Sequence, residues 1–149
     1  MPDSKLDRTW DDIFDRYRVG GREAITEAEH DWIRVSNFRY QVGNGGLSQY
    51  IYNPWDAATE FDDTIAALQR LGAPFAAVVI RDIAQLFESG APFDTDERYN
   101  EFLSWPENSD KWHILDAADE KIASKLDALD ELLDEFILGN SFCDLEDLD

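Results

Sequence analysis

The chain has 149 residues, with 33 Asp and Glu against 13 Lys and Arg, which gives a formal net charge of -20 at pH 7. A surface that binds nucleic acid or an anionic membrane needs clustered Lys and Arg, so this charge argues against both as direct ligands. Because 44% of the residues are hydrophobic and 13% are aromatic, far more than in a disordered acidic segment, we expect a folded domain with one core.

Apolar residues recur at spacings of three and four through most of the chain, which predicts amphipathic helices. A capping box of Thr26 and Glu29 marks the start of the second helix, and Asn44 and Gly45 can end it near Gly43. Asn53-Pro54 predicts a turn. The predicted helical ranges are 6–17, 26–42, 61–71, 75–87, 99–105 and 115–137.

No segment alternates between apolar and polar residues as a half-buried strand would. We therefore predict an all-α fold: a single compact multi-helix domain ending in a long amphipathic acidic helix. The ranges 61–71 and 75–87 are expected to pack against each other. The domain is placed at residues 1–140, followed by an acidic C-terminal tail at residues 141–149.

The last predicted helix carries an acidic stripe. At 100° per residue, five of its acids fall within about 60° of one another, and from Asp116 to Asp134 they would span roughly 27 Å. With Glu135 added, the predicted partner-binding residues are Asp116, Glu120, Asp127, Glu131, Asp134 and Glu135. Two alternatives stay open at this point: an acidic face that is simply solvated, and adaptation to high salt, which 21 Asp against 12 Glu would fit.

Other possible sites have simpler interpretations. Glu27 with His30, and Asp110 with His113, repeat a spacing that ligates paired metals in helical bundles, but Glu27 is interpreted as a first-turn acid and Asp110 as a helix N-cap. Cys143 lies among acids that disfavour its thiolate. The glycine-rich segment 43–46 lacks the Lys-Ser or Lys-Thr of a phosphate loop. We expect no catalytic residues, no metal and no cofactor.

Residues 37–53 read Asn-Phe-Arg-Tyr-Gln-Val-Gly-Asn-Gly-Gly-Leu-Ser-Gln-Tyr-Ile-Tyr-Asn. This stretch resembles the signature of the bacterial DNA-mimic protein domain family, and the resemblance continues more loosely through residues 67–73 and the apolar helix after them. It implies an all-α fold, often dimeric, that presents acids where DNA phosphates would sit and so occupies a DNA-binding protein such as a transcription regulator. The signature residues themselves are interpreted as architectural.

These observations lead to a functional hypothesis: a non-enzymatic cytoplasmic protein that mimics DNA charge and binds a basic DNA-binding protein. The resemblance adds a homodimer to the expected states of the chain. Neither nucleic acid nor membrane is expected as a direct partner. The alternatives are an immunity-type inhibitor of a nuclease toxin and a helical domain whose acidity serves solvation alone. The expected location follows from the lack of a basic leader and of any long apolar run.

Overall fold

The computed structural model describes residues 5–52, 61–88 and 95–139. Within these ranges the secondary structure consists of helices without a strand, which confirms the predicted all-α fold. The predicted Asn53-Pro54 turn and the tail at 141–149 lie outside the described residues. The elements are α1 (Lys5–Gly20), the short 3-10 helix η1 (Arg22–Ala24), α2 (Glu27–Tyr52), α3 (Phe61–Leu71), α4 (Pro74–Ala84), α5 (Thr95–Ser104), α6 (Asp110–Ala123) and α7 (Leu126–Gly139).

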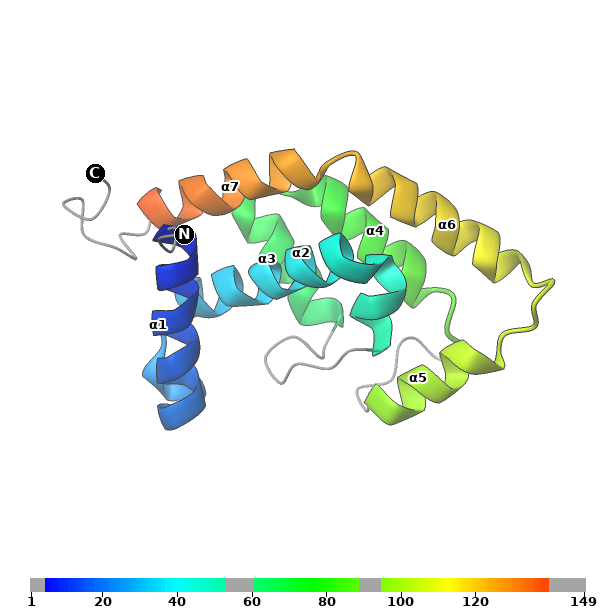
Figure 1. The fold of residues 1–149 in the computed structure, drawn as a ribbon, viewed down its shortest axis with the longest axis horizontal. Coiled ribbons are helices and arrows are strands. Elements are labelled where there is room, and N and C mark those ends of the chain that lie inside the picture. The colour runs from blue at the N-terminus through cyan, green and yellow to red at the C-terminus, as the bar shows by residue number, and fades with distance from the viewer. Residues whose placement is uncertain (1–4, 53–60, 89–94, 140–149) are drawn as a thin grey trace.

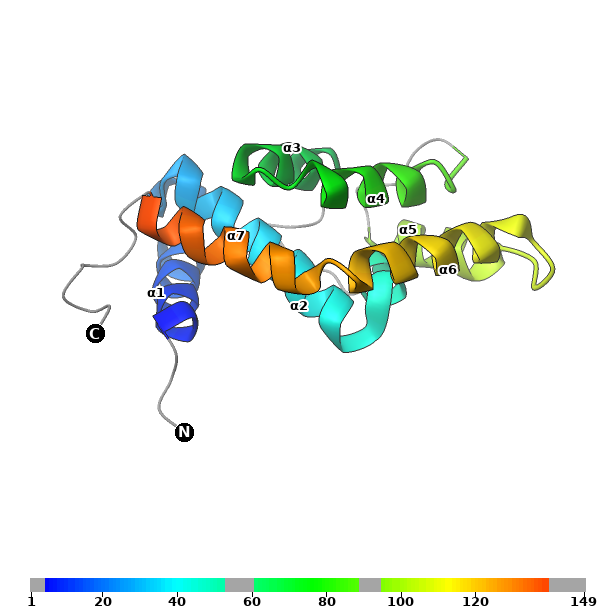
Figure 2. The ribbon, with the colours of Figure 1, turned by 90° about the horizontal axis from the view of Figure 1, so that it is seen from above.

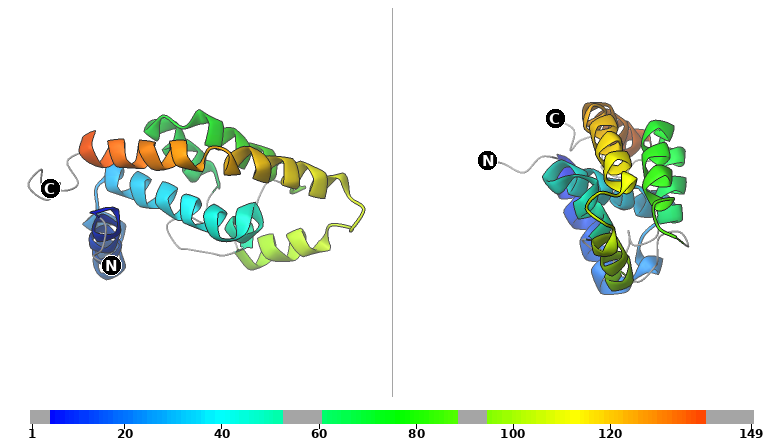
Figure 3. Two further views of the ribbon diagram at one scale, coloured as in Figure 1. Left: turned by 45° about the horizontal axis from the view of Figure 1, so that its top comes forward. Right: turned by 90° about the vertical axis from the view of Figure 1, so that its right-hand side faces the viewer.

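Helix α2 is the element around which the others are arranged. It runs along the molecule below α7 and α6, which follow one another and both pack against it (Figure 1). Figure 2 shows α3 and α4 beside the α6–α7 pair, and α3 contacts α2 while α4 contacts α6. Helix α1 crosses the N-terminal end of α2 (Figure 3). No helix in the described part of the chain is long and apolar enough to cross a membrane.

The start of α2 is fixed by the predicted capping box. The backbone N–H of Glu29 donates to Thr26 Oγ1 at 3.0 Å, and the N–H of Thr26 donates to Glu29 Oε1 at 2.9 Å. The Glu29 carboxylate also accepts hydrogen bonds from Arg16 of α1. Burial raises the pKa of Glu29, but the hydrogen bonds from Arg16 and Thr26 outweigh burial and leave the pKa below its ordinary value. One carboxylate therefore caps α2 and docks α1.

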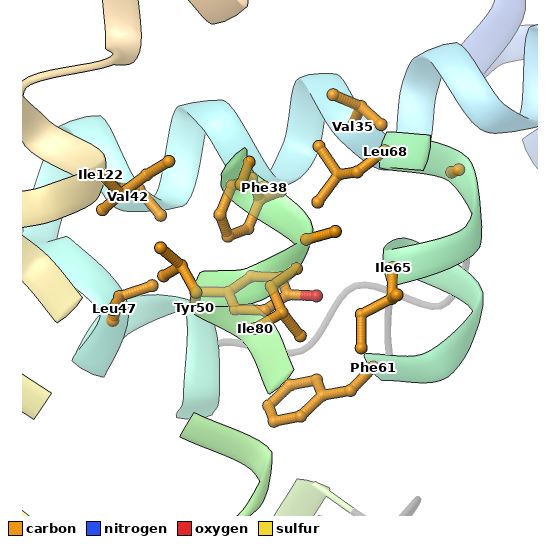
Figure 4. Close-up of a cluster of buried hydrophobic side chains, with 14 of the residues drawn as sticks. Val35, Phe38, Val42, Leu47, Tyr50, Phe61, Ile65, Leu68, Ile80 and Ile122 are labelled. Carbon is orange, nitrogen blue, oxygen red and sulfur yellow. The ribbon is translucent and has the colours of Figure 1, made fainter. Parts of the chain in front are cut away.

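The core lies between α2 and the helices that cover it (Figure 4). Tyr50 makes an edge contact with Phe38 at 4.9 Å between ring centroids and stacks on Phe61 at 5.4 Å. Trp32 is 2% exposed, and its indole N–H donates to the Leu133 carbonyl of α7 at 3.2 Å. The expected packing of α3 against α4 is confirmed. Helix α4 ends at Ala84 rather than at the predicted Phe87, which is buried in the turn that follows.

The predicted end of the second helix near Gly43 is confirmed, because α2 consists of two helical limbs separated by a bend at Gly45 and Gly46. Gly45 and Gly46 leave helical geometry, and Gly46 has a φ of 74°, a value that L side chains rarely adopt. The chain then resumes as a helix to Tyr52. The Gln49 side chain donates to Gln41 Oε1 at 2.7 Å, so an amide pair joins the two limbs of α2 across the bend. This supports the architectural interpretation of the segment.

The predicted long final helix is wrong in one respect: it consists of two helices, α6 and α7, separated at Ser124 and Lys125. The Ser124 hydroxyl donates to the Lys121 carbonyl at 2.8 Å, and the Lys125 N–H donates to the Ile122 carbonyl, three residues back. Such bonds compete with the regular helical pattern and bend helices. Apolar periodicity does not report the break because it continues on both sides.

The predicted N-cap at Asp110 is also wrong by one residue. Ser109 has extended backbone geometry, and its hydroxyl accepts a hydrogen bond from the Lys111 N–H at 3.2 Å. Asp110 is instead the first residue of α6, where its charge favours the helix N-terminus.

We predict that Gly46→Ala lowers the free energy of unfolding by more than Gly21→Ala does. Gly21 and Gly46 combine a positive φ with a ψ of -166° and -169°, a region that is essentially restricted to glycine, so both substitutions carry a backbone cost of about 1–3 kcal/mol. At Gly46 a Cβ would also come within 3.0 Å of Asp119 Oδ1, whereas at Gly21 it would meet nothing within 4 Å. Urea unfolding followed by tryptophan fluorescence measures both values, and equal losses would contradict the proposed crowding at the bend.

Candidate functional site: an acidic face on α6 and α7

All of the predicted partner-binding acids are exposed. We call this set the acidic face; its members are Asp116, Glu120, Asp127, Glu131, Asp134 and Glu135. Opposite it, each helix buries three apolar residues against the body of the molecule. These are Leu115, Ala118 and Ile122 in α6 and Leu129, Leu133 and Ile137 in α7.

The acidic face continues across the break between the two helices. Both α6 and α7 turn their buried sides toward α2, against which both pack. On each helix the exposed acids lie about 100–170° around the axis from the centre of the buried residues, at 100° per residue. The interruption at Ser124 and Lys125 therefore does not turn one half of the face away from the other.

A sequence repeat explains this agreement. The segment Leu-Asp-Ala-Ala-Asp-Glu at 115–120 recurs eleven residues later as Leu-Asp-Ala-Leu-Asp-Glu at 126–131. Eleven residues make about three helical turns, so equivalent residues have the same orientation on the two helices. The repeat is visible in the sequence, and it contains two further acids outside the acidic face, Asp119 and Asp130.

Asp119 and Asp130 occupy equivalent positions in the repeat and point toward α2. Asp119 Oδ1 accepts a hydrogen bond from the Leu47 N–H at 2.6 Å. Asp130 accepts two from Arg39, at 2.8 Å from Nε and 3.1 Å from Nη2. They are held by α2, unlike the exposed acids beside them.

The acidic face is not neutralised by arginine. Among the described residues, no ion pair includes any of its six members. The pairs that do form are Arg16 with Asp12 and Glu29, Arg18 with Asp15, Arg22 with Glu27, Arg39 with Asp130, and Arg70 with Asp31. The face therefore keeps its negative charge available to a partner.

Neighbouring carboxylates repel one another on this surface. Burial raises the pKa of Asp134, and the charges of Asp130 and Glu131 raise it further. Burial also raises the pKa of Asp119, with Asp116 adding to the effect and the Leu47 hydrogen bond opposing it. Holding these charges together costs folding free energy, which is a common property of functional surfaces.

The possible metal site is not assembled. No group of three or more metal-ligating side chains occurs in the described residues. The His30 ring packs near the Tyr17 ring, and its Nε2 lies 3.4 Å from Nη2 of Arg34. Burial lowers the pKa of His30 to about 4, and the charges of Arg34 and Arg22 contribute to the shift. Glu27 lies in the first turn of α2, as predicted. It also forms an ion pair with Arg22. Cys143 lies outside the residues that the structure describes.

We predict that Asp134→Asn raises the free energy of unfolding at neutral pH and low salt by about 0.3–0.5 kcal/mol, the usual cost of a like-charge pair on a helix. Because folding raises the pKa of Asp134, its ionised form favours the unfolded chain. The gain should shrink as the pH falls through the raised pKa and vanish below the ordinary value of 3.8.

Asp130→Asn is the matched control and should lower stability, because it weakens the pair with Arg39. Urea titrations of both variants at low and high NaCl measure the difference. A gain for Asp134→Asn that is equally large in high salt would contradict repulsion between charges as its cause.

Comparison with known proteins gives one match. The family model described as "DMP19-like protein" matches residues 23–140, which include all of α2 to α7 and exclude α1. No curated protein and no solved structure matches the chain. The match covers more than half of the sequence, including both helices of the acidic face and the bend in α2. The chain therefore belongs to the DMP19-like protein family.

Proposed function

We propose that this chain is a non-enzymatic protein whose acidic face binds a basic DNA-binding protein, such as a transcription regulator, in the place that DNA would occupy. The observation that carries the proposal is the set of six exposed carboxylates on α6 and α7, without an ion pair to any described residue. Membership of the family supports it, because DMP19 abbreviates DNA mimic protein 19.

The chemistry of the acidic face suits a surface lined with Arg and Lys. Carboxylate oxygens accept short charge-assisted hydrogen bonds from these side chains, as phosphate oxygens do. Acids one turn apart on a helix lie about 5–6 Å from each other. Because α6 and α7 are packed on α2, the carboxylates lie on an ordered scaffold, which reduces the entropic cost of binding.

The net charge of -20 would act before contact. Opposite charges accelerate the encounter of two proteins, and this acceleration falls as salt screens the field. The same charge repels phosphate, so direct binding of nucleic acid is not part of the proposal.

We predict that reversing Asp127, Glu131 and Asp134 to Lys abolishes capture of the partner while the protein stays folded. All three side chains are exposed on α7, so the substitutions change charge without opening the core. Tagged protein is used to capture host proteins, which are identified by mass spectrometry. DNA that the captured partner binds is then added, and we expect this DNA to release the partner from the tagged protein.

The matched control reverses Asp11, Asp62 and Glu107 to Lys. These acids are also exposed, lie on α1, α3 and the α5–α6 connection, and change the net charge by the same amount. The control should retain the partner. Equal loss in both variants would show that net charge, rather than the acidic face, governs binding. Capture of a nuclease whose cleavage is suppressed would favour the inhibitor alternative.

A further inference from the structure

The two inward acids of the repeat contact different limbs of α2. Asp130 of α7 holds Arg39, which precedes the bend, with two hydrogen bonds of 2.8 and 3.1 Å. Asp119 of α6 holds the N–H of Leu47, the first residue after Gly46, at 2.6 Å. Each helix of the acidic face is therefore attached to its own limb of α2 by one carboxylate.

The glycine-rich segment 43–46 leaves space for both attachments. A Cβ on Gly43 would overlap the Arg39 guanidinium that reaches Asp130. A Cβ on Gly46 would lie 3.0 Å from Asp119 Oδ1, in a backbone conformation that already disfavours side chains. The glycines thus serve the contacts with α6 and α7 as well as the bend itself.

The break between α6 and α7 means that one helix does not by itself fix the direction of the other. The Ser124 N–H keeps the regular hydrogen bond to Glu120, four residues back, and the interruption comes at Lys125, whose N–H donates to Ile122, three residues back. An interrupted helix bends more easily than a continuous one. The angle between the two halves of the acidic face therefore depends on what holds each half from outside.

We propose that Asp119 and Asp130 are positioning residues: they fix α6 to one limb of α2 and α7 to the other, and so set the spacing between the partner-facing carboxylates of the two helices. Their own oxygens are engaged by α2, and the exposed acids provide the contacts. The statement about the partner rests on the proposed function. The statement about the geometry of α6 and α7 stands without it.

The geometry is tested by a distance measurement in the whole protein. Cys143 is replaced by Ser, and nitroxide labels are placed on Ala117→Cys in α6 and Gly139→Cys at the end of α7, both exposed positions. These labels are roughly 33 Å apart along two aligned helices, within range of pulsed electron paramagnetic resonance. The label positions leave every acid of the face unchanged.

We expect Asp119→Ala and Asp130→Ala each to shift and broaden the distance distribution, while far-UV circular dichroism shows that the helices are kept. Asp119→Asn should restore the parent distribution, because its side-chain oxygen can still accept the Leu47 N–H. The double variant Arg39→Asp with Asp130→Arg exchanges the two charges of the α7 attachment and should also give the parent distribution. Glu131→Ala, on the exposed side of α7, should leave it unchanged.

Unchanged distributions in folded Asp119→Ala and Asp130→Ala would overturn the proposal. If either alanine variant fails to fold, Arg39→Gln tests the α7 attachment and Asp119→Leu tests the α6 attachment, with the same expected shift. The two proposals can fail separately. If the label distances shift as expected in the Asp119 and Asp130 variants, but the α7 charge-reversal variant still binds the partner fully, the proposed function is overturned and the positioning role is kept.

Discussion

The packing of the remaining helices depends on the bend of α2 at Gly45 and Gly46. The bend gives α2 two limbs, each with its own neighbours, and α6 and α7 attach to them separately through Asp119 and Asp130. The Gln41–Gln49 amide pair stabilises the bend from within α2. A straight α2 would move the Leu47 N–H away from Asp119 and misalign the surface against which α6 packs.

Charge is distributed unevenly between attachment and exposure. Several described arginines hold acids at helix junctions, such as Arg16 with Glu29, Arg70 with Asp31 and Arg39 with Asp130. The six acids of the acidic face form no ion pair with any described residue. Burial raises the pKa of Asp134, and the charges of Asp130 and Glu131 raise it further. The molecule thus uses ion pairs for docking its helices and keeps a concentrated negative surface at some expense of stability.

The arrangement of the exposed acids supports the proposed binding role more strongly than net charge alone does. A merely solvated face needs no particular arrangement, whereas here the same acidic pattern appears twice, on two helices attached to one scaffold. The interrupted connection at Ser124 allows the two halves to take the orientation that α2 imposes. The spacing of the carboxylates is then a property of the whole fold, as recognition of a cationic groove would require.

The sequence by itself determined the helical class, most helix boundaries, the capping box at Thr26 and Glu29, and the exposure of the acidic face. These features follow from local periodicity and side-chain chemistry, which act within a few residues. Only the tertiary structure decided that the last helix is divided and that Asp119 and Asp130 face inward. The inward positions depend on contacts between residues far apart in the chain, Leu47 with Asp119 and Arg39 with Asp130, which no local pattern encodes. The division is bonded locally at Ser124 and Lys125, but apolar periodicity that continues on both sides conceals it.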